Sequence, residues 1–133
     1  MVEIESRVAS RVLENLAEME VELVGAGIFG PDRLPVSVTA HPATWPESAT
    51  ELLAAIEAAS GEEEVDSAHI ATAEGEVFVV SEGGYSLVAA TGRYVLASLT
   101  TYDMRMALRD AIREGGGDRG REAGSGQGRT EDA

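Results

Sequence analysis

A run of apolar segments separated by glycine turns occupies residues 76–99, EVFVVSEGGYSLVAATGRYVLASL. Glycines in such a setting either form a loop that cradles phosphate or make turns between strands. A phosphate loop lies between a strand and the N-terminus of a helix. Here each glycine turn leads into another apolar segment, and the chain has no lysine and no GxxxxGK[ST] motif. The run therefore predicts an antiparallel meander.

A second glycine motif, GAGIFG at Gly25–Gly30, matches the dinucleotide-binding pattern GxGxxG letter by letter. That pattern binds a dinucleotide only where a helix begins at the glycines. The segment PDRLPV follows instead and cannot start a helix. We interpret this region as a hairpin of Val21–Phe29 with Leu34–Ala40. Pro35 cannot donate a ladder hydrogen bond, so the second strand should lie at an edge or begin there.

Three segments have helical character. Apolar residues recur at helical spacing over residues 3–20, which predicts the first helix. The second helix follows Thr44 and ends at Gly61, and the third follows Thr100 or Thr101 and ends at Gly115–Gly117. Around them the candidate strands number six, of which Ala68–Ala73 is either a loop or an extension of the next strand.

The fold class predicted from this order is α+β (mixed α/β). A five-stranded antiparallel sheet carries the first and last helices on one face and the second helix on the other. Residues 1–114 form the folded domain. The remaining 115–133 contain seven glycines and almost no apolar residue, which predicts a disordered tail.

The charge of the chain narrows the classes of partner. The net charge is -14 and all ten basic residues are arginine, so the surface should repel nucleic acid and anionic membranes. There is no cysteine, no apolar run long enough to span a bilayer and no visible signal peptide, which favours a cytoplasmic protein. His41 and His69 are the only histidines and do not define a metal site, so we expect no metal, cofactor or catalytic residue.

The element order, and above all residues 76–113, resembles the roadblock family, also called the dynein light chain roadblock fold. The likeness extends over about residues 3–114, including the hairpin at VELVGAGIFGPDRLPVSVTA. Members of this family are dimeric scaffolds or regulators for small Ras-like GTPases, or adaptors in larger machines, and prokaryotic members often lie beside a small GTPase gene. The resemblance therefore implies a non-enzymatic homodimer that binds a small Ras-like GTPase. Two alternatives stay open: an adaptor subunit of a motor or signalling complex, and a small-molecule sensor.

Two surfaces are candidates for binding. The last helix carries the chain's one cluster of arginines in the folded domain, and arginine, tyrosine and methionine are enriched at interfaces. The predicted partner interface comprises Tyr102, Arg105, Met106, Arg109 and Arg113. The competing interpretation is that Arg109 and Arg113 pair with Glu14 and Glu18 of the first helix.

The second surface is expected to join two copies of the chain. Small residues on the second helix permit close helix approach, and a strand at Glu76–Ser81 is expected at an open sheet edge. The competing interpretation is that alanine simply favours a solvated helix. The predicted dimer interface comprises Glu47, Glu51, Ala54, Ala55, Ala58, Val77 and Val79.

Overall fold

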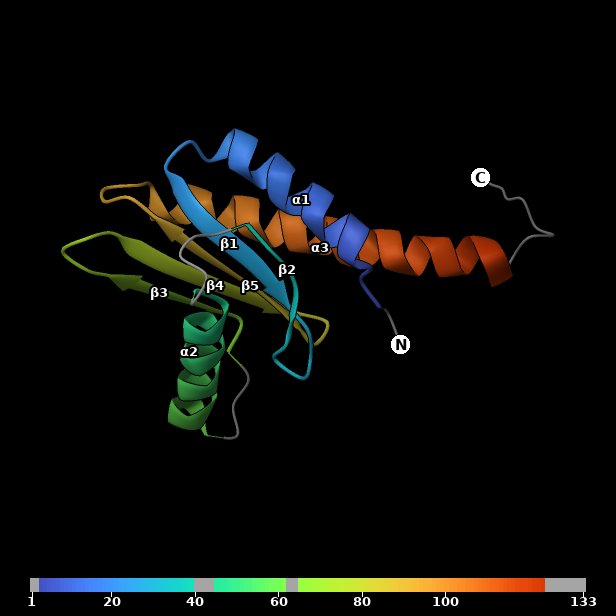
Figure 1. Cartoon of the computed structure of the whole chain (residues 1–133), viewed down its shortest axis with the longest axis horizontal. Helices are drawn as coiled ribbons and strands as arrows, with labels where there is room; N and C mark the ends of the chain where they lie inside the picture. The colour runs from blue at the N-terminus through green and yellow to red at the C-terminus, as the bar shows by residue number, and fades with distance from the viewer. Residues whose placement is uncertain (1–2, 40–44, 62–64, 124–133) are drawn as a thin grey trace.

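Helices and strands alternate as helix, hairpin, helix, meander and helix in a computed structural model that describes residues 3–39, 45–61 and 65–123 (Figure 1). The elements are α1 (Ser6–Met19), β1 (Leu23–Phe29), β2 (Pro35–Val38), α2 (Trp45–Ser60), β3 (Ser67–Ala71), β4 (Glu76–Glu82), β5 (Tyr85–Thr91) and α3 (Ala97–Ala123). The strands form one antiparallel sheet in the order β2-β1-β5-β4-β3. The sheet therefore ends in β2 on one side and β3 on the other.

The helices α1 and α3 lie side by side on one face of the sheet (Figure 1). They run antiparallel, since Glu20 at the end of α1 bonds Thr100 in the first turns of α3. Their apolar stripes pack on alternate residues of β1, β4 and β5, such as Ile28 and Phe78, to form the larger core. The predicted helical spacing of α1 is confirmed.

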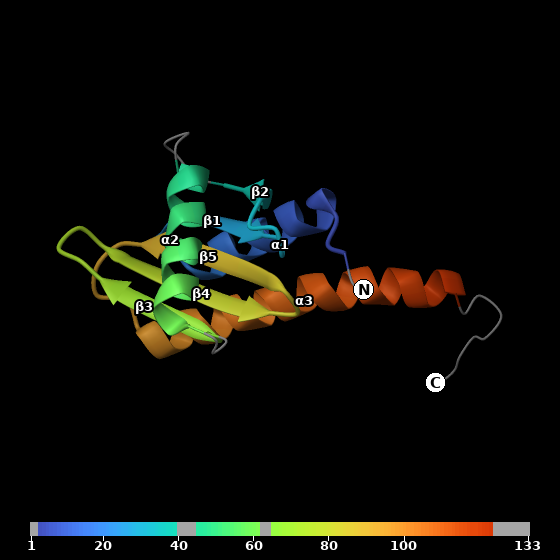
Figure 2. The same cartoon turned by 90° about the horizontal axis from the view of Figure 1, so that it is seen from below.

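The single helix α2 crosses the opposite face of the sheet (Figure 2). Ala49 and Leu53 of α2 pack against Phe29, Val79 and Val88 in a smaller core. One helix is narrower than a five-stranded sheet, so part of this face stays uncovered. The predicted arrangement of two helices against one is confirmed.

The GxGxxG match at Gly25–Gly30 lies in β1 and in the turn to β2, not at the start of a helix, so it is part of a hairpin and not a dinucleotide-binding loop. Its turn is closed by a hydrogen bond of 2.8 Å from the Arg33 N–H to the Gly30 carbonyl, and Arg33 has φ +64. Pro35 is the first residue of β2, an edge strand, where its missing N–H costs little. The hairpin and the place of its proline are confirmed.

The structure answers one open question about the strands and corrects one prediction. Residues 67–71 form a strand of their own, β3, which pairs with β4 along its whole length. The apolar segment at 94–100 is not a strand, because α3 begins at Ala97, before the predicted cap at Thr100 or Thr101. The Leu96 carbonyl already accepts the N–H groups of Leu99 and Thr100, both at 3.0 Å.

The end of α3 also differs from the prediction. Gly61 has φ +69 and ends α2, but Gly115–Gly117 keep the helical conformation and α3 continues to Ala123. Residues 124–133 lie outside the described residues, and the domain boundary at Glu114 stays a prediction. Within the described residues, no helix is both long and apolar enough to cross a membrane.

Candidate interaction surfaces

The arginine cluster lies outside the buried side of α3, with Arg113 exposed and with Arg105 and Arg109 directed toward Glu82 at the end of β4. The buried residues Met104, Leu108 and Ala111 occupy the opposite side of the helix. Tyr102 is 60% exposed, and the side chain of Arg113 is 69% exposed. The five residues that the sequence predicts as a partner interface are thus brought together on one helix.

The ion pairs of this cluster differ from those expected. Nε of Arg109 lies 2.9 Å from both carboxylate oxygens of Glu82, and Arg105 lies 3.7 Å from the same carboxylate. Arg113 pairs with Asp110 at 2.8 Å. The expected pairing of Arg109 and Arg113 with Glu14 and Glu18 is therefore wrong.

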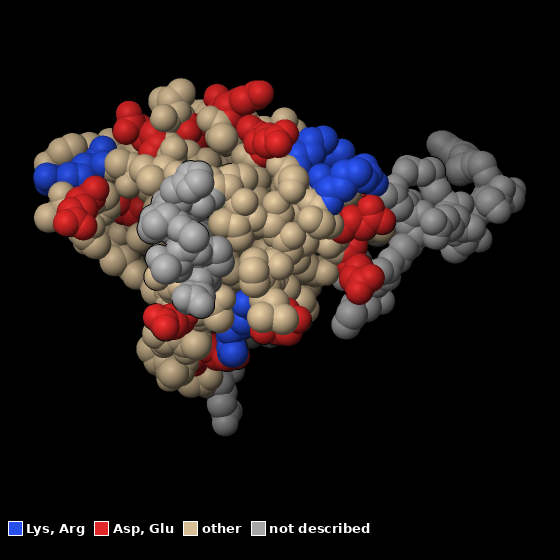
Figure 3. All heavy atoms as spheres, in the orientation of Figure 1, with Lys and Arg blue, Asp and Glu red and all other residues tan. Residues whose placement is uncertain are grey.

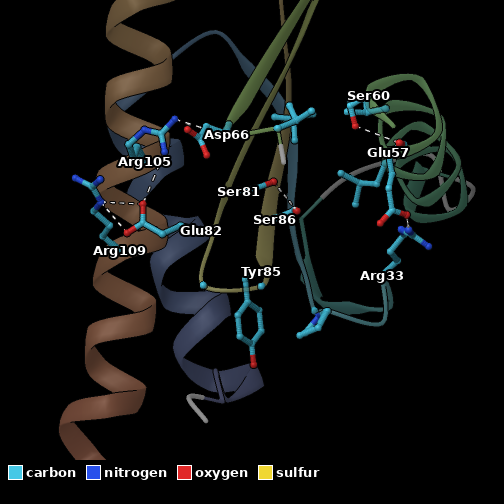
Figure 4. Close-up of a pocket in the computed structure, with 18 of the residues that line it drawn as sticks. Arg33, Glu57, Ser60, Asp66, Ser81, Glu82, Tyr85, Ser86, Arg105 and Arg109 are labelled. Atoms are coloured by element: carbon cyan, nitrogen blue, oxygen red, sulfur yellow. Dashed lines mark hydrogen bonds and ion pairs between the residues drawn. The ribbon is translucent and has the colours of Figure 1, made fainter. Parts of the chain in front are cut away.

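The side of α3 on which α1 packs explains this correction. α1 contacts β1 and β2 whereas α3 contacts β4 and β5, so Arg105 and Arg109, which extend toward Glu82 of β4, face away from α1. The ion pair that does join the two helices is Arg11 with Glu114. Arg105 and Arg109 instead extend toward the β4–β5 turn, where they share Glu82 (Figure 4).

A hollow of about 650 Å³ separates this turn from α2. Figure 4 shows Arg105, Arg109 and Glu82 on one side of it, with Arg33 and Glu57 on the other. Arg33 and Glu57 form an ion pair, and the three arginines that line the hollow are matched in number by three acids, Glu57, Asp66 and Glu82. The hollow therefore offers no excess of positive charge to an anion.

The floor of this hollow changes from apolar to polar along the strands. Val79 and Val88 pack under α2, and two residues further on their places are taken by Ser81 and Ser86. The two serine hydroxyls hydrogen-bond each other at 2.9 Å. This hollow has no signal in the sequence, because its residues come from five segments that only the fold brings together.

The exposed side of α2 carries the small residues of the predicted dimer interface. Ala54, Ala55, Ala58 and Glu51 are all exposed, as a helix face that meets a partner requires. The side chain of Glu47 lies outside the described residues.

The strand part of the predicted dimer interface needs correction. β4 does not lie at an edge, because it is paired with β5 on one side and with β3 on the other. Val79 is buried under α2 and Val77 packs beside the same core, so neither is presented to another chain. Because β3 was not recognised as a separate strand, the edge was assigned to the wrong element.

The open edge on this side of the sheet is β3. The Ser81 N–H donates to the Asp66 carbonyl at 2.9 Å, and the Thr72 N–H donates to the Gly75 carbonyl at 2.8 Å. The backbone N–H and C=O groups of the even-numbered residues are therefore directed toward β4. By the alternation of an antiparallel ladder, Ser67, His69 and Ala71 point theirs away from the sheet. No other strand of the described chain pairs with that side of β3.

The His69 side chain fastens β3 to its neighbours. Its ring stacks on Phe78, with the centroids 4.4 Å apart, and its Nε2 lies 2.6 Å from Oε1 of Glu76. The other carboxylate oxygen of Glu76 accepts the Tyr94 N–H at 2.9 Å. The hydrogen bond with His69 is the main cause that lowers the pKa of Glu76 below its usual value.

Comparison with solved structures identifies the architecture. The chain is similar to a roadblock/LC7 domain from Streptomyces avermitilis, at TM-score 0.68 and 16% identity, over 84% of this chain and 98% of the other. It is also similar to MglB from Myxococcus xanthus, at TM-score 0.60 and 16% identity, over 81% and 90% of the two chains. An MglB with a tetrameric arrangement matches at TM-score 0.65 and 14% identity, over 86% and 94%. A scan against protein-family models finds no match, and no curated protein matches in sequence.

A five-stranded antiparallel sheet in the order β2-β1-β5-β4-β3, with two helices on one face and one on the other, defines an α+β scaffold. This scaffold is the roadblock/LC7 fold. The resemblance found in the sequence is thus confirmed at the level of the fold.

Proposed function

We propose that the chain is a non-enzymatic homodimeric scaffold that binds a small Ras-like GTPase and regulates it. The observation that carries the proposal is the roadblock fold with its unpaired β3 edge, beside a helix that presents small side chains. The family resemblance supplies the class of partner. The direction of regulation is left to experiment.

Two copies of the chain would meet through β3. Its outward N–H and C=O groups, at Ser67, His69 and Ala71, offer a strand-pairing edge that proteins otherwise block. Pairing two such edges about a two-fold axis gives a self-complementary contact that closes. The C-terminal end of α2 lies over the β3 side of the sheet (Figure 2), so Ala58 would approach the partner's α2 in such a pair.

The α2 contact has its own test. Arginine in place of both Ala54 and Ala58 adds long charged side chains to a face where close approach is required. The double variant should lower the mass of the particle in solution toward that of one chain. Ala17→Arg, on the exposed side of α1, is the matched control and should leave the mass unchanged.

The outer face of α3 is the proposed GTPase-binding surface. Arg113 is the most exposed arginine of the cluster, and Tyr102 adds a large aromatic side chain about three turns earlier on the helix. Arginine and tyrosine contribute more to binding than most residues when a partner covers them. Arg105 and Arg109 are held by Glu82 and fix the edge of this surface.

The experiment uses small Ras-like GTPases cloned from the same genome, loaded with GDP or with a non-hydrolysable GTP analogue. Binding to the purified chain is measured by calorimetry. Tyr102→Ala with Arg113→Glu should weaken binding by about tenfold or more. Arg7→Glu, equally exposed on α1, is the control and should leave binding unchanged. Absence of a complex with every such GTPase in both nucleotide states would contradict the proposal.

A small-molecule sensor remains the second candidate because of the hollow beside Ser81 and Ser86. Its volume of about 650 Å³ lies within the range of known ligand sites. A ligand that binds the folded chain raises its melting temperature by mass action. A thermal-shift screen in which one metabolite class raises the Tm, and Ser86→Val removes the rise, would favour the sensor. The adaptor alternative predicts a partner that is not a GTPase.

A further inference from the structure

One end of the molecule carries most of the large apolar side chains that remain exposed. Nine such side chains are exposed in the described part of the chain, and six of them belong to two short segments. Their exposed fractions run from 51% for Leu99 to 86% for Val21. The six are Met19, Val21, Val24, Tyr94, Leu96 and Leu99. We call this surface the apolar end.

The two segments lie side by side at the end of the sheet opposite the C-terminus (Figure 1). The Gly92 N–H donates a hydrogen bond of 3.1 Å to the Glu22 carbonyl, and Leu23 is paired with Thr91. The apolar end is therefore a surface built by the fold from distant parts of the sequence, not a frayed segment.

At this end large apolar side chains are exposed, whereas a soluble monomer normally buries its largest apolar side chains. Along the loop before α3, Val95 and Ala97 pack against the core, whereas the larger Tyr94 and Leu96 are exposed. Soluble monomers rarely expose a cluster of large apolar side chains, and where they do it commonly marks an interaction site. The apolar end thus has the composition of a docking surface.

The charges around this surface indicate what it can accept. Residues 18–24 and 92–103 contain four acids, of which Glu20 is buried, and one base, Arg93. The guanidinium of Arg93 lies over the ring of Tyr94, at 4.5 Å from its centroid, and so is already engaged. Glu18 and Glu22 are exposed at the rim, and Figure 3 shows one small blue area at this end with red areas beside it. An acidic rim around apolar side chains complements a partner with apolar anchors flanked by cations.

We propose that the apolar end docks a cationic amphipathic segment of another protein. Such a segment is a helix with an apolar stripe and flanking lysine or arginine. A second copy of this chain would bring the same acidic rim of Glu18 and Glu22 against it. An anionic membrane would be repelled for the same reason. The proposal goes beyond GTPase binding and uses residues that neither β3 nor the α3 arginines supply.

The test uses a synthetic amphipathic helix of leucine and lysine, about 18 residues long and labelled with a fluorophore. Its anisotropy should rise with added protein, and higher salt should weaken the binding. A matched peptide with glutamate in place of lysine should not bind. Changing Leu96 and Leu99 together to serine should weaken binding about tenfold or more. The matched control is Leu34→Ser with Ile70→Ser, which alters the two exposed aliphatic residues outside this end.

Several results would overturn the proposal. They are failure of the leucine–lysine peptide to bind, equal binding of the glutamate peptide, or unchanged affinity after the change at Leu96 and Leu99. A fall in the mass of the protein after that change would assign the surface to contacts between copies. Co-sedimentation with vesicles of phosphatidylcholine and phosphatidylglycerol, lost in the same variant, would assign it to a membrane. Thermal melts should show that both double variants stay folded, because all four positions are exposed.

Discussion

The hydroxyl of Thr100 donates a hydrogen bond of 3.1 Å to the carboxylate of Glu20, the residue that caps the end of α1. Both residues are buried, and Asp103 lies close enough to hydrogen-bond the same carboxyl group. Burial, followed by the contact with Asp103, raises the pKa of Glu20 to about 7. The junction of α1 with α3 therefore favours a protonated Glu20.

This raised pKa predicts a pH dependence of stability. A carboxyl group whose pKa is raised in the folded state contributes stability that is fully present below its unfolded pKa of 4.5 and is lost as pH rises through about 7. The Tm should therefore fall by several degrees between about pH 5 and about pH 8. Glu20→Gln should remove most of this fall, and Glu18→Gln, at an exposed neighbour, should not. An equal fall in the Glu20→Gln variant would contradict the assignment.

The lowered pKa of Glu76 acts in a separate pH range. The stability that Glu76 contributes is present above its unfolded pKa of 4.5. It is lost only in acid, as the pH falls through the lower pKa that Glu76 has in the folded state. The two carboxyl groups can thus be told apart in one pH titration of the Tm. Glu76→Gln should change the acid side of the curve, and Glu20→Gln the neutral side.

In the β3–β4 turn, adding one methyl group at Gly75 should strongly lower the stability of the fold. A Cβ on Gly75 would lie 2.3 Å from the carbonyl oxygen of Thr91, which is backbone and cannot turn aside. Gly75→Ala should therefore cost about 1–3 kcal/mol in the free energy of unfolding, measured by urea denaturation. Gly61→Ala is the control, because nothing lies within 4 Å there and only its φ of +69 opposes alanine. A Gly75→Ala protein as stable as the parent would show that the turn lies elsewhere.

The glycine-rich C-terminal segment is expected to be dispensable for folding. A chain that ends at Gly115 keeps the ion pair of Arg11 with Glu114 and the whole of both cores. Its Tm should stay within a few degrees of the full chain's, although α3 continues to Ala123. A loss of more than about 2 kcal/mol in the free energy of unfolding would place the domain boundary beyond Glu114.

Local patterns predicted those parts of the fold that depend on neighbours in sequence. The stripe of α1, the hairpin with Pro35 at its start and the end of α2 at Gly61 each follow from a few adjacent residues. The apolar run at 94–100 has no such marker, and short apolar runs suit strand and helix alike. Its exposure on the apolar end could not be read from the residues.

Spatial order was the harder part. β3 has only five residues, and four of them are exposed, so the alternation between its two faces is weak. If β3 is not counted as a strand, β4 becomes the edge of the sheet. Val77 and Val79 were predicted as dimer residues on that basis. The ion-pair partners of the α3 arginines depend on which side of α3 faces α1 and which faces β4, and residue spacing does not determine that.

Pairing of two chains through β3 is tested most directly by the mass of the particle in solution, measured by light scattering coupled to size exclusion. A homodimer should have about twice the chain mass of 13.9 kDa at tens of micromolar. Ala71→Pro removes an outward N–H from the β3 edge without breaking the β3–β4 ladder, and should give the mass of one chain. Ala71→Ser, which keeps that N–H, should remain paired. A mass of one chain for the unmodified protein, or an Ala71→Pro variant that stays paired, would contradict pairing through β3.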